Sequence, residues 1–533
     1  LIEVPGLASG KATLKASLQG ATDTAAENDH HAIISLNGKQ IGETVWDGTR
    51  AHVLDVEFDA SLLQDGANTL TVRGALDMGA PYSTFYVEAF DLSYPRYYKA
   101  VENRLICRGD SNSTISISGL MEPQVVVLDV SNPLRPKHLT GVSPDVSGRV
   151  SFVPRSTSSV YLVSGLNSAL RPASVVGDQP ADLKGPSHSA EYVVIAPEEF
   201  RETAKQLAKY RQGRKLNSVV VTLEEIYDVF SYGVPSPYAI REFLVHAYTK
   251  WSGKKLRYAV LAGKGTYDYN DYRGYGDNLV PAILGRTPEG LCAADKIYGD
   301  VKGRDGLPEI AIGRLPAVTS AELGAMISKI KAYESGRGDW TDKAVFIADN
   351  ADSGGDFAES CNELAMLAAG LKVEKIYLNG LAQETRSKII ASWNEGAALV
   401  NYCGHGGINQ LATENIFNVT DAKALQNDAR LPMATMFTCV TGRFELPGYT
   451  SLGEALLLNT NGGMAGGLLP SGAAMNSDSL RLGGEFYKAV YRGREESAGM
   501  ALLAAMKKYL QTGGQASLLN VYNWLGDPAL AFK

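Results

Sequence analysis

Hydrophobic and polar residues alternate along the first 95 residues in the manner of half-buried β-strands. In the segment 54–58, apolar residues occupy every second position and acidic residues lie between them. The apolar run 32–36 leads into Asn37-Gly38, a pair typical of tight hairpin turns. We therefore predict an all-β domain over residues 1–95.

Short apolar runs continue over residues 96–165, for example at 125–130 and 160–163, and prolines separate them. This pattern predicts a second, small β-rich domain. Residues 166–190 contain several prolines and few large apolar residues, as expected of a linker.

A different pattern begins at Tyr192, where apolar runs alternate with amphipathic segments. Thr319 and Glu322 have the spacing of a helix capping box. Strands and helices in alternation predict a mostly parallel sheet flanked by helices, here over residues 191–533. The predicted strands, rich in Val and Ile, are 192–196, 218–221, 258–262, 344–348, 375–378, 398–402 and 434–437.

Composition narrows the possible functions of this multidomain chain of 533 residues. The net charge is −7 and no dense basic run occurs, which argues against a nucleic-acid partner. No stretch approaches the roughly 20 apolar residues of a transmembrane segment. Five cysteines occur without a CxxC pair, so a structural zinc site is not predicted. Because the chain starts at Leu1 rather than Met, we expect its natural beginning to be missing.

Two of the predicted strands end in residues that carry chemistry. The strand 398–402 leads to His405 within CGHGG, and the strand 434–437 leads to Cys439 within TCVTG. Catalytic groups collect at the carboxyl ends of parallel strands, and an imidazole can generate a nucleophilic thiolate. The backbone N–H groups of Gly406 and Cys439 are our candidates for an oxyanion hole.

An alternative role exists for each of these residues. A cysteine that ends a buried strand is usually a small core residue, and this applies to Cys403 even more than to Cys439. After residue 190 the only other histidine is His246, which lies in a helical pattern away from any strand end. His405 is therefore the obvious general base for a cysteine–histidine enzyme.

The two segments NYCGHGG and FTCVTGRF resemble the active-site pair of the gingipain family of cysteine peptidases. Residues 192–248 resemble the family's opening strand–helix–strand unit, and AADKIYGDVKGRDGLPEIAIGRLP resembles its central stretch. The closing segments TSLGEALLLNTNGGMAGGLLPSG and YNWLGDPAL follow in the family's order. The resemblance implies a caspase-like α/β domain with Cys439 as nucleophile and His405 as base.

The N-terminal segments ISLNGKQIGETVW and LLQDGANTLTVRG resemble the galactose-binding-like jelly rolls of secreted enzymes. This resemblance implies a β-sandwich fold and a possible carbohydrate or cell-surface ligand. The region ending in DLSYPRYYKA resembles the β-rich part that precedes the peptidase in the type IX secretion sortase and its relatives. A secreted or cell-surface location in a bacterium is the corresponding expectation.

The gingipain resemblance also implies roles for residues that follow the strand 344–348. A carboxylate that orients His405 is expected here, with Asp349 as first choice and Asp352 as second. Asp356 corresponds to the acidic specificity residue of arginine-cleaving members, which would favour Arg or Lys in the substrate. Its alternative role is to cap the helix that begins near Phe357.

Family members bind calcium structurally, and the loop with Asp268, Asp271 and Asp277 is a possible site, although solvated loop carboxylates are the default interpretation. No cofactor is required for the expected chemistry. The favoured function is a cysteine endopeptidase, with a preference for Arg or Lys at P1. One alternative is a sortase-like transpeptidase that attaches proteins to a surface anchor, and another is a catalytically silent surface binding protein.

Overall fold

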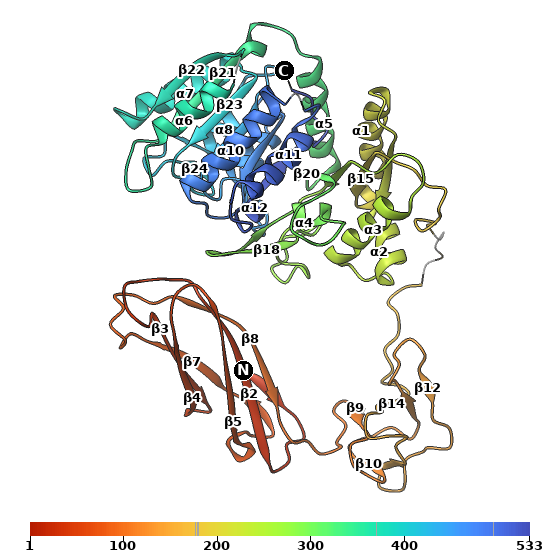
Figure 1. Ribbon diagram of the computed structural model, residues 1–533. Coiled ribbons are helices and arrows are strands. Elements are labelled where there is room, and N and C mark those ends of the chain that lie inside the picture. Colours follow the sequence, from red (N-terminus) through yellow and green to blue (C-terminus); the bar gives the residue numbers. More distant parts are fainter. Residues whose placement is uncertain (176, 178–180, 369, 494, 533) are drawn as a thin grey trace. The chain divides into compact units, whose positions relative to one another are not determined.

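The computed structural model describes residues 1–175, 177, 181–368, 370–493 and 495–532. The chain forms two compact units, residues 1–178 and 179–533, which are described separately. Their elements are labelled in Figure 1. Of the predicted linker 166–190, residues 176 and 178–180 lie outside the described part.

The first unit begins with a sandwich of two antiparallel three-stranded sheets. One sheet has the order β5 (Ala51–Asp59), β2 (Lys11–Gly20), β8 (Phe85–Ser93), and the other β4 (Lys39–Trp46), β3 (His30–Leu36), β7 (Leu70–Ala75). Alternate residues of β2, such as Leu14, pack with Ile34 and Phe58 between the sheets. The short strands β1 (Ile2–Val4) and β6 (Gly66–Asn68) pair beside them. Alternate burial along these strands thus packs the two sheets face to face as a sandwich.

A small β-rich region with its own core follows in the same unit. Its four-stranded antiparallel sheet has the order β12 (Lys137–His138), β11 (Val125–Asp129), β14 (Val160–Gly165), β9 (Arg104–Arg108). The strands β10 (Ile115–Ile117) and β13 (Val150–Phe152) form a separate pair.

The second unit is built on one sheet of ten strands. In sheet order these are β16 (Ser218–Thr222), β15 (Tyr192–Ala196), β17 (Tyr258–Ala262), β20 (Ala311–Leu315), β28 (Tyr522–Leu525), β27 (Gly466–Pro470), β26 (Met433–Phe437), β23 (Leu399–Cys403), β21 (Lys343–Ala348) and β22 (Lys372–Tyr377). All neighbours are parallel except β27 and β28. The sheet therefore consists of two parallel halves that run in opposite directions.

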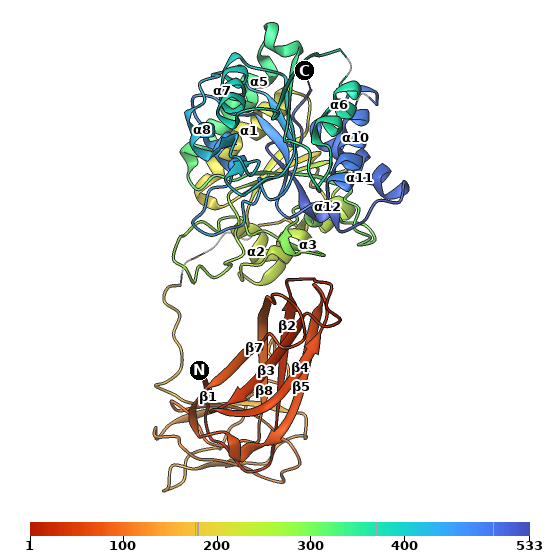
Figure 2. The ribbon, with the colours of Figure 1, turned by 90° about the vertical axis from the view of Figure 1, so that its left-hand side faces the viewer.

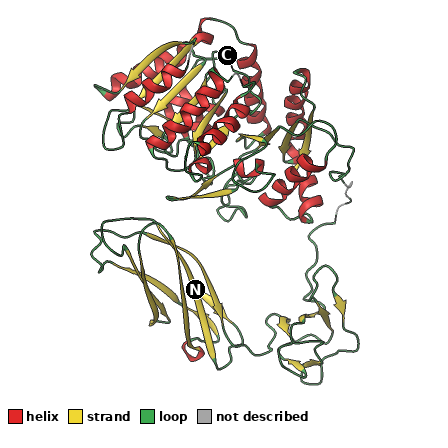
Figure 3. Cartoon of the chain, viewed as in Figure 1, coloured by secondary structure: helices red, strands yellow, loops and turns green. Residues whose placement is uncertain are grey.

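Helices cover both faces of this sheet, as Figures 2 and 3 show. The predicted capping box is confirmed at α5, where Glu322 N donates to Thr319 Oγ1 (3.2 Å) and Thr319 N donates to Glu322 Oε2 (3.1 Å). None of the helices in the described residues is long and apolar enough to span a membrane. The helices are α1 (Arg201–Gly213), α2 (Leu223–Ser231), α3 (Pro237–Lys250), α4 (Lys296–Gly299), α5 (Ser320–Ser335), α6 (Phe357–Leu367), α7 (Ala382–Glu395), α8 (Val419–Ala424), α9 (Leu452–Leu458), α10 (Asn476–Tyr491), α11 (Ala498–Gln511) and α12 (Leu518–Val521).

Candidate active site

His405 is fixed through its backbone immediately beyond the end of β23. Its N–H donates to Asp349 Oδ2 (3.0 Å), and its carbonyl accepts from the Tyr402 hydroxyl (2.6 Å) and from Ala412 N (2.8 Å). A Cβ at Gly404 would lie 2.3 Å from the Tyr402 hydroxyl oxygen, so this turn requires glycine. The imidazole itself remains 47% exposed.

Asp352 is the carboxylate that contacts the imidazole. Its Oδ2 lies 2.9 Å from His405 Nε2, while its Oδ1 accepts from Gly354 N (2.7 Å). The Gly354 N–H bond first and the imidazole second hold the pKa of Asp352 below its usual value. The ring of Phe357 packs edge-on against His405, with centroids 5.2 Å apart. The imidazole is thus oriented by a carboxylate on one side and an aromatic ring on another.

Asp349, our first choice for this orienting role, contacts the histidine backbone instead. Ala348 pairs with Cys403 in the sheet, so the next residue, Asp349, lies beside the backbone of the turn that carries His405. Its two oxygens accept from His405 N and Asn350 N. Burial raises the pKa of Asp349, against the effect of these two bonds. The first expectation is therefore corrected: the second choice, Asp352, reaches the ring.

Asp356 is exposed and caps α6, where its Oδ1 accepts from Glu359 N (2.9 Å). This position is not the base of a substrate pocket, which is where the family resemblance led us to expect Asp356. The alternative role as a helix cap is the one that the structure displays, because Asp356 precedes the first helical residue, Phe357.

Cys439 lies at the same edge of the sheet as His405. β26 and β23 are parallel neighbours with Phe437 opposite Cys403, and each functional residue follows its strand by two positions. The half-buried Sγ accepts from Ala474 N (3.4 Å) and lies 3.7 Å from Ala474 O. Burial raises the pKa of the thiol, the Ala474 N–H lowers it, and the charge of Glu289 raises it further. Within the described residues, no hydrogen bond joins Cys439 to His405.

Two backbone N–H groups beside the thiol are available as donors. Among the described residues, neither Gly406 N nor Cys439 N has a protein acceptor. The two segments touch: a Cβ at Gly406 would lie 2.9 Å from Cys439 O and 2.4 Å from Thr438 Oγ1. Val440 adopts φ +45°, an uncommon conformation for a β-branched residue, and donates to Gly472 O (3.1 Å). Free donors next to a strained turn can stabilise a developing oxyanion.

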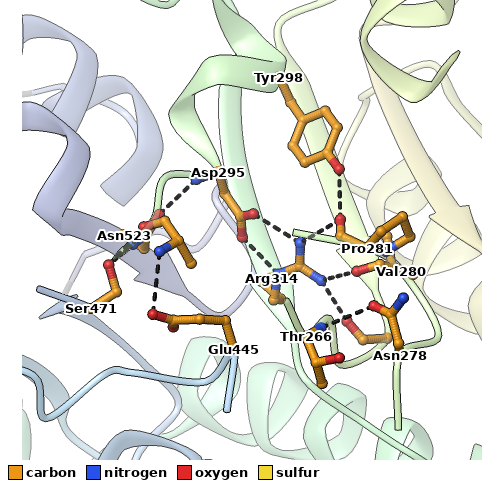
Figure 4. A network of polar contacts seen from close by, with 12 residues as sticks. Thr266, Asn278, Val280, Pro281, Asp295, Tyr298, Arg314, Glu445, Ser471 and Asn523 are labelled. Carbon is orange, nitrogen blue, oxygen red and sulfur yellow. Dashed lines mark hydrogen bonds and ion pairs between the residues drawn. The ribbon is translucent and has the colours of Figure 1, made fainter. Parts of the chain in front are cut away.

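A buried polar network centred on Arg314 connects to the turn that carries Cys439 (Figure 4). The guanidinium of Arg314 binds both oxygens of Asp295, at 2.6 and 2.8 Å. Asp295 N donates to Asn523 Oδ1 (2.8 Å), and Asn523 Nδ2 donates to Ser471 Oγ (3.0 Å). Ser471 directly precedes Gly472, the acceptor for Val440. The network thus links β20 and β28 to the segment that supports Cys439.

The side chains of Cys403 and His246 have the surroundings of structural residues. Asn401 Nδ2 donates to the sulfurs of Cys361 (3.3 Å) and Cys403 (3.4 Å), and both thiols are buried. Both cysteines are core residues, which is the alternative role given above for Cys403. His246 is half-buried in α3, edge-on to Phe230.

The carboxylates proposed for calcium do not converge. Asp268 accepts from two backbone N–H groups of its own loop, and Asp277 pairs with Lys264 (3.5 Å). In the described part of the chain, one group of three acidic residues has oxygens that all lie within 4.8 Å of one another: Asp23, Asp29 and Asp47, in the first unit. Asp29 already accepts three protein hydrogen bonds.

Sequence reasoning missed Ala474 and Phe357 as site residues. Ala474 acts through its backbone, which leaves no side-chain signal in the sequence. Phe357 is apolar and begins a helix, so its pattern is that of any core residue.

Most of the second unit matches a known protein family. Residues 185–533 match Peptidase family C25. Gingipain R2 and gingipain R1 of Porphyromonas gingivalis are each 25% identical over 371 residues, which is 64% of this chain but 46% and 34% of theirs. The chain thus spans about half, or less, of the length of these curated relatives.

The solved structures that resemble this chain show the same fold. The crystal structure of the Arg-specific cysteine proteinase gingipain R superposes with a TM-score of 0.55 at 24% identity, covering 64% of this chain and 78% of that one. A complex of the pro- and mature domains of a Porphyromonas gingivalis gingipain has a TM-score of 0.54 at 23% identity, covering 64% and 80%. On the family match, which extends over most of its length and contains both His405 and Cys439, the chain belongs to peptidase family C25.

Proposed function

We propose that the protein is a cysteine endopeptidase in which Cys439 attacks a peptide carbonyl and His405 is the general base. The observation that carries this proposal is the placement of both residues just beyond the ends of adjacent parallel strands. His405 takes the proton of Cys439, and the thiolate forms a tetrahedral adduct with the carbonyl carbon. Protonated His405 then gives its proton to the leaving amine, and water hydrolyses the thioester.

The neighbouring groups have separate roles in this mechanism. Gly406 N and Cys439 N donate to the oxyanion, because both lack other acceptors among the described residues. Asp352 orients the imidazole and stabilises its protonated form, and Asp349 fixes the backbone of His405. Since burial raises the pKa of the Cys439 thiol, the reaction depends on a base that removes its proton during attack.

A preference for Arg or Lys at P1 is the finer part of the proposal. It is supported by the similarity to a gingipain described as Arg-specific and by the acidic residues Asp352 and Glu289 near the reacting groups. Asp356, as an exposed helix cap, adds no support. A secreted or cell-surface location in a bacterium is proposed on the similarity to the Porphyromonas gingivalis relatives.

The test compares the full chain with Cys439→Ala and His405→Ala on a library of peptides, with Cys107→Ala as a control for loss of a buried cysteine. We expect cleavage by the wild type and the control, and a loss of at least about a thousandfold in both site variants. Mass spectrometry in heavy-oxygen water with an added amine identifies the acceptor. A product with a labelled carboxylate supports hydrolysis. A product in which the added amine forms an amide would show transpeptidation instead.

A further inference from the structure

The outer face of β9 in the small β-rich region carries an unusual set of exposed side chains. Along this edge strand, Leu105 and Cys107 point into the core, so Arg104, Ile106 and Arg108 face outward. Ile106 is 58% exposed. The alternation places a basic, an apolar and a second basic side chain in a row, about 7 Å apart.

A cleft of about 450 Å³ is lined by Ile106 and Arg108 of this row. Its other wall is the segment 94–98, in which Tyr97 is 63% exposed. A second hollow of about 430 Å³ is lined by Arg104 and shares Arg96, Leu105 and Ile106 with the first. The two together form a trough whose floor is apolar and whose sides are aromatic and basic, as in many ligand sites.

Two polar residues that line the cleft, Tyr98 and Asp110, are hydrogen-bonded to each other. The Tyr98 hydroxyl donates to Asp110 Oδ2 (2.6 Å) and accepts from Asn112 Nδ2 (3.0 Å). Arg108, in contrast, has no carboxylate partner among the described residues. Arg96 and Arg108 line the first hollow beside Asp110, and Arg96 and Arg104 line the second beside Glu102, so arginines outnumber carboxylates in both hollows.

We propose that this cleft binds a short acidic oligosaccharide. The exposed face of Tyr97 stacks on a pyranose ring, the guanidinium of Arg108 pairs with a uronate carboxylate, and the Asp110 carboxylate accepts from a sugar hydroxyl. A purely anionic peptide would use Arg108 but neither the ring face of Tyr97 nor the Asp110 carboxylate. The site lies on the small β-rich region, outside the sandwich for which the sequence predicted a sugar ligand. It is independent of the peptidase reaction.

Isothermal titration of the full chain with oligogalacturonate tests this inference, with a neutral galactan oligosaccharide and a polyglutamate peptide as comparison ligands. We expect oligogalacturonate to bind most tightly. Tyr97→Ala and Arg108→Gln should each weaken its binding about tenfold or more, because each removes a direct contact. In Arg108→Gln the difference between the acidic and the neutral sugar should disappear.

Tyr82→Ala and Arg73→Gln are matched controls, since both residues are exposed on the sandwich outside the cleft. They should bind oligogalacturonate as the wild type does, and circular dichroism confirms that each variant is folded. The inference is overturned if oligogalacturonate does not bind the wild type, if polyglutamate binds equally well, or if the two cleft variants bind like the controls.

Discussion

His405 is held by two carboxylates that do different work. Asp349 binds its backbone from a buried position, and Asp352 binds its ring from an exposed one. A group that orients an imidazole affects proton transfer, whereas a group that fixes the backbone affects the position of the turn. Substitutions at the two positions should therefore differ in their kinetic effect.

We expect Asp352→Asn to lower kcat by about tenfold or more with little change in KM, because the imidazolium loses its anionic partner. Asp349→Asn should lower kcat less than about threefold, since the amide oxygen still accepts from His405 N and the pKa of Asp349 is already raised by burial. Steady-state kinetics on one peptide decide between them. The reverse order of the two effects would contradict this assignment.

The Cys439 thiol should show its dependence on His405 through pH. Because burial raises its pKa above the ordinary 9.0, the isolated thiol remains protonated at neutral pH. In His405→Ala, the rate of iodoacetamide alkylation at Cys439 should therefore still be rising above pH 9. Peptide mapping by mass spectrometry separates Cys439 from the four buried cysteines. A rate that levels off below pH 8 in this variant would refute the argument.

The two glycines after His405 make a matched pair of substitutions. A Cβ at Gly406 would lie 2.4 Å from Thr438 Oγ1, whereas at Gly407 the nearest atom beyond the flanking residues would be Gln410 Cγ at 3.4 Å. We expect Gly406→Ala to lose at least about a hundredfold in kcat/KM, since the added Cβ displaces an oxyanion donor. Gly407→Ala, whose Cβ has room, should lose less than about fivefold in kcat/KM. Equal losses would show that Gly406 has no special position.

At the scale of elements, Asp356 at the start of helix α6 has two interpretations: a helix N-cap and a carboxylate of the substrate pocket. As an N-cap, Asp356→Ala should lower the free energy of unfolding by about 1 kcal/mol, measured by urea denaturation. The ratio of kcat/KM for arginyl and leucyl peptides should stay within about twofold, because the carboxylate is exposed and bound to Glu359 N. A collapse of that ratio without loss of stability would restore the pocket interpretation.

Apolar runs predicted the strands that they fill, including β15, β17 and β26, because burial on both faces demands such runs. The sequence did not predict β20, β27 and β28 as strands from their pattern. β20 contains the buried Arg314, β27 begins with two glycines, and β28 contains the buried Asn523. Their polar residues are satisfied by partners far along the chain, which no local pattern can reveal.

The sequence likewise predicted part of the candidate site and not the rest. Strand ends and flanking glycines located His405 and Cys439, but the choice between Asp349 and Asp352 depends on a tight turn. In that turn, Asp352 and Gly355 exchange backbone hydrogen bonds, and Gly355 adopts φ +140°. This turn places the Asp352 carboxylate next to the imidazole of His405. The spacing of residues in the sequence does not specify the geometry of the turn.

At the scale of the whole molecule, chemistry and surface binding fall in different units. Every residue of the proposed peptidase site lies within residues 179–533, and the proposed saccharide cleft lies within residues 1–178. The family match covers only the former. The first unit is therefore expected to determine where the enzyme acts rather than how it cleaves.

The most direct test of the central claim is mass spectrometry of the full chain after incubation with a peptidyl-arginine chloromethyl ketone and with its leucine counterpart. We predict a single adduct on Cys439, formed much more slowly in His405→Ala and favoured by the arginine compound. No adduct on Cys439 with either compound, or equal labelling in His405→Ala, would contradict the assignment of nucleophile and base.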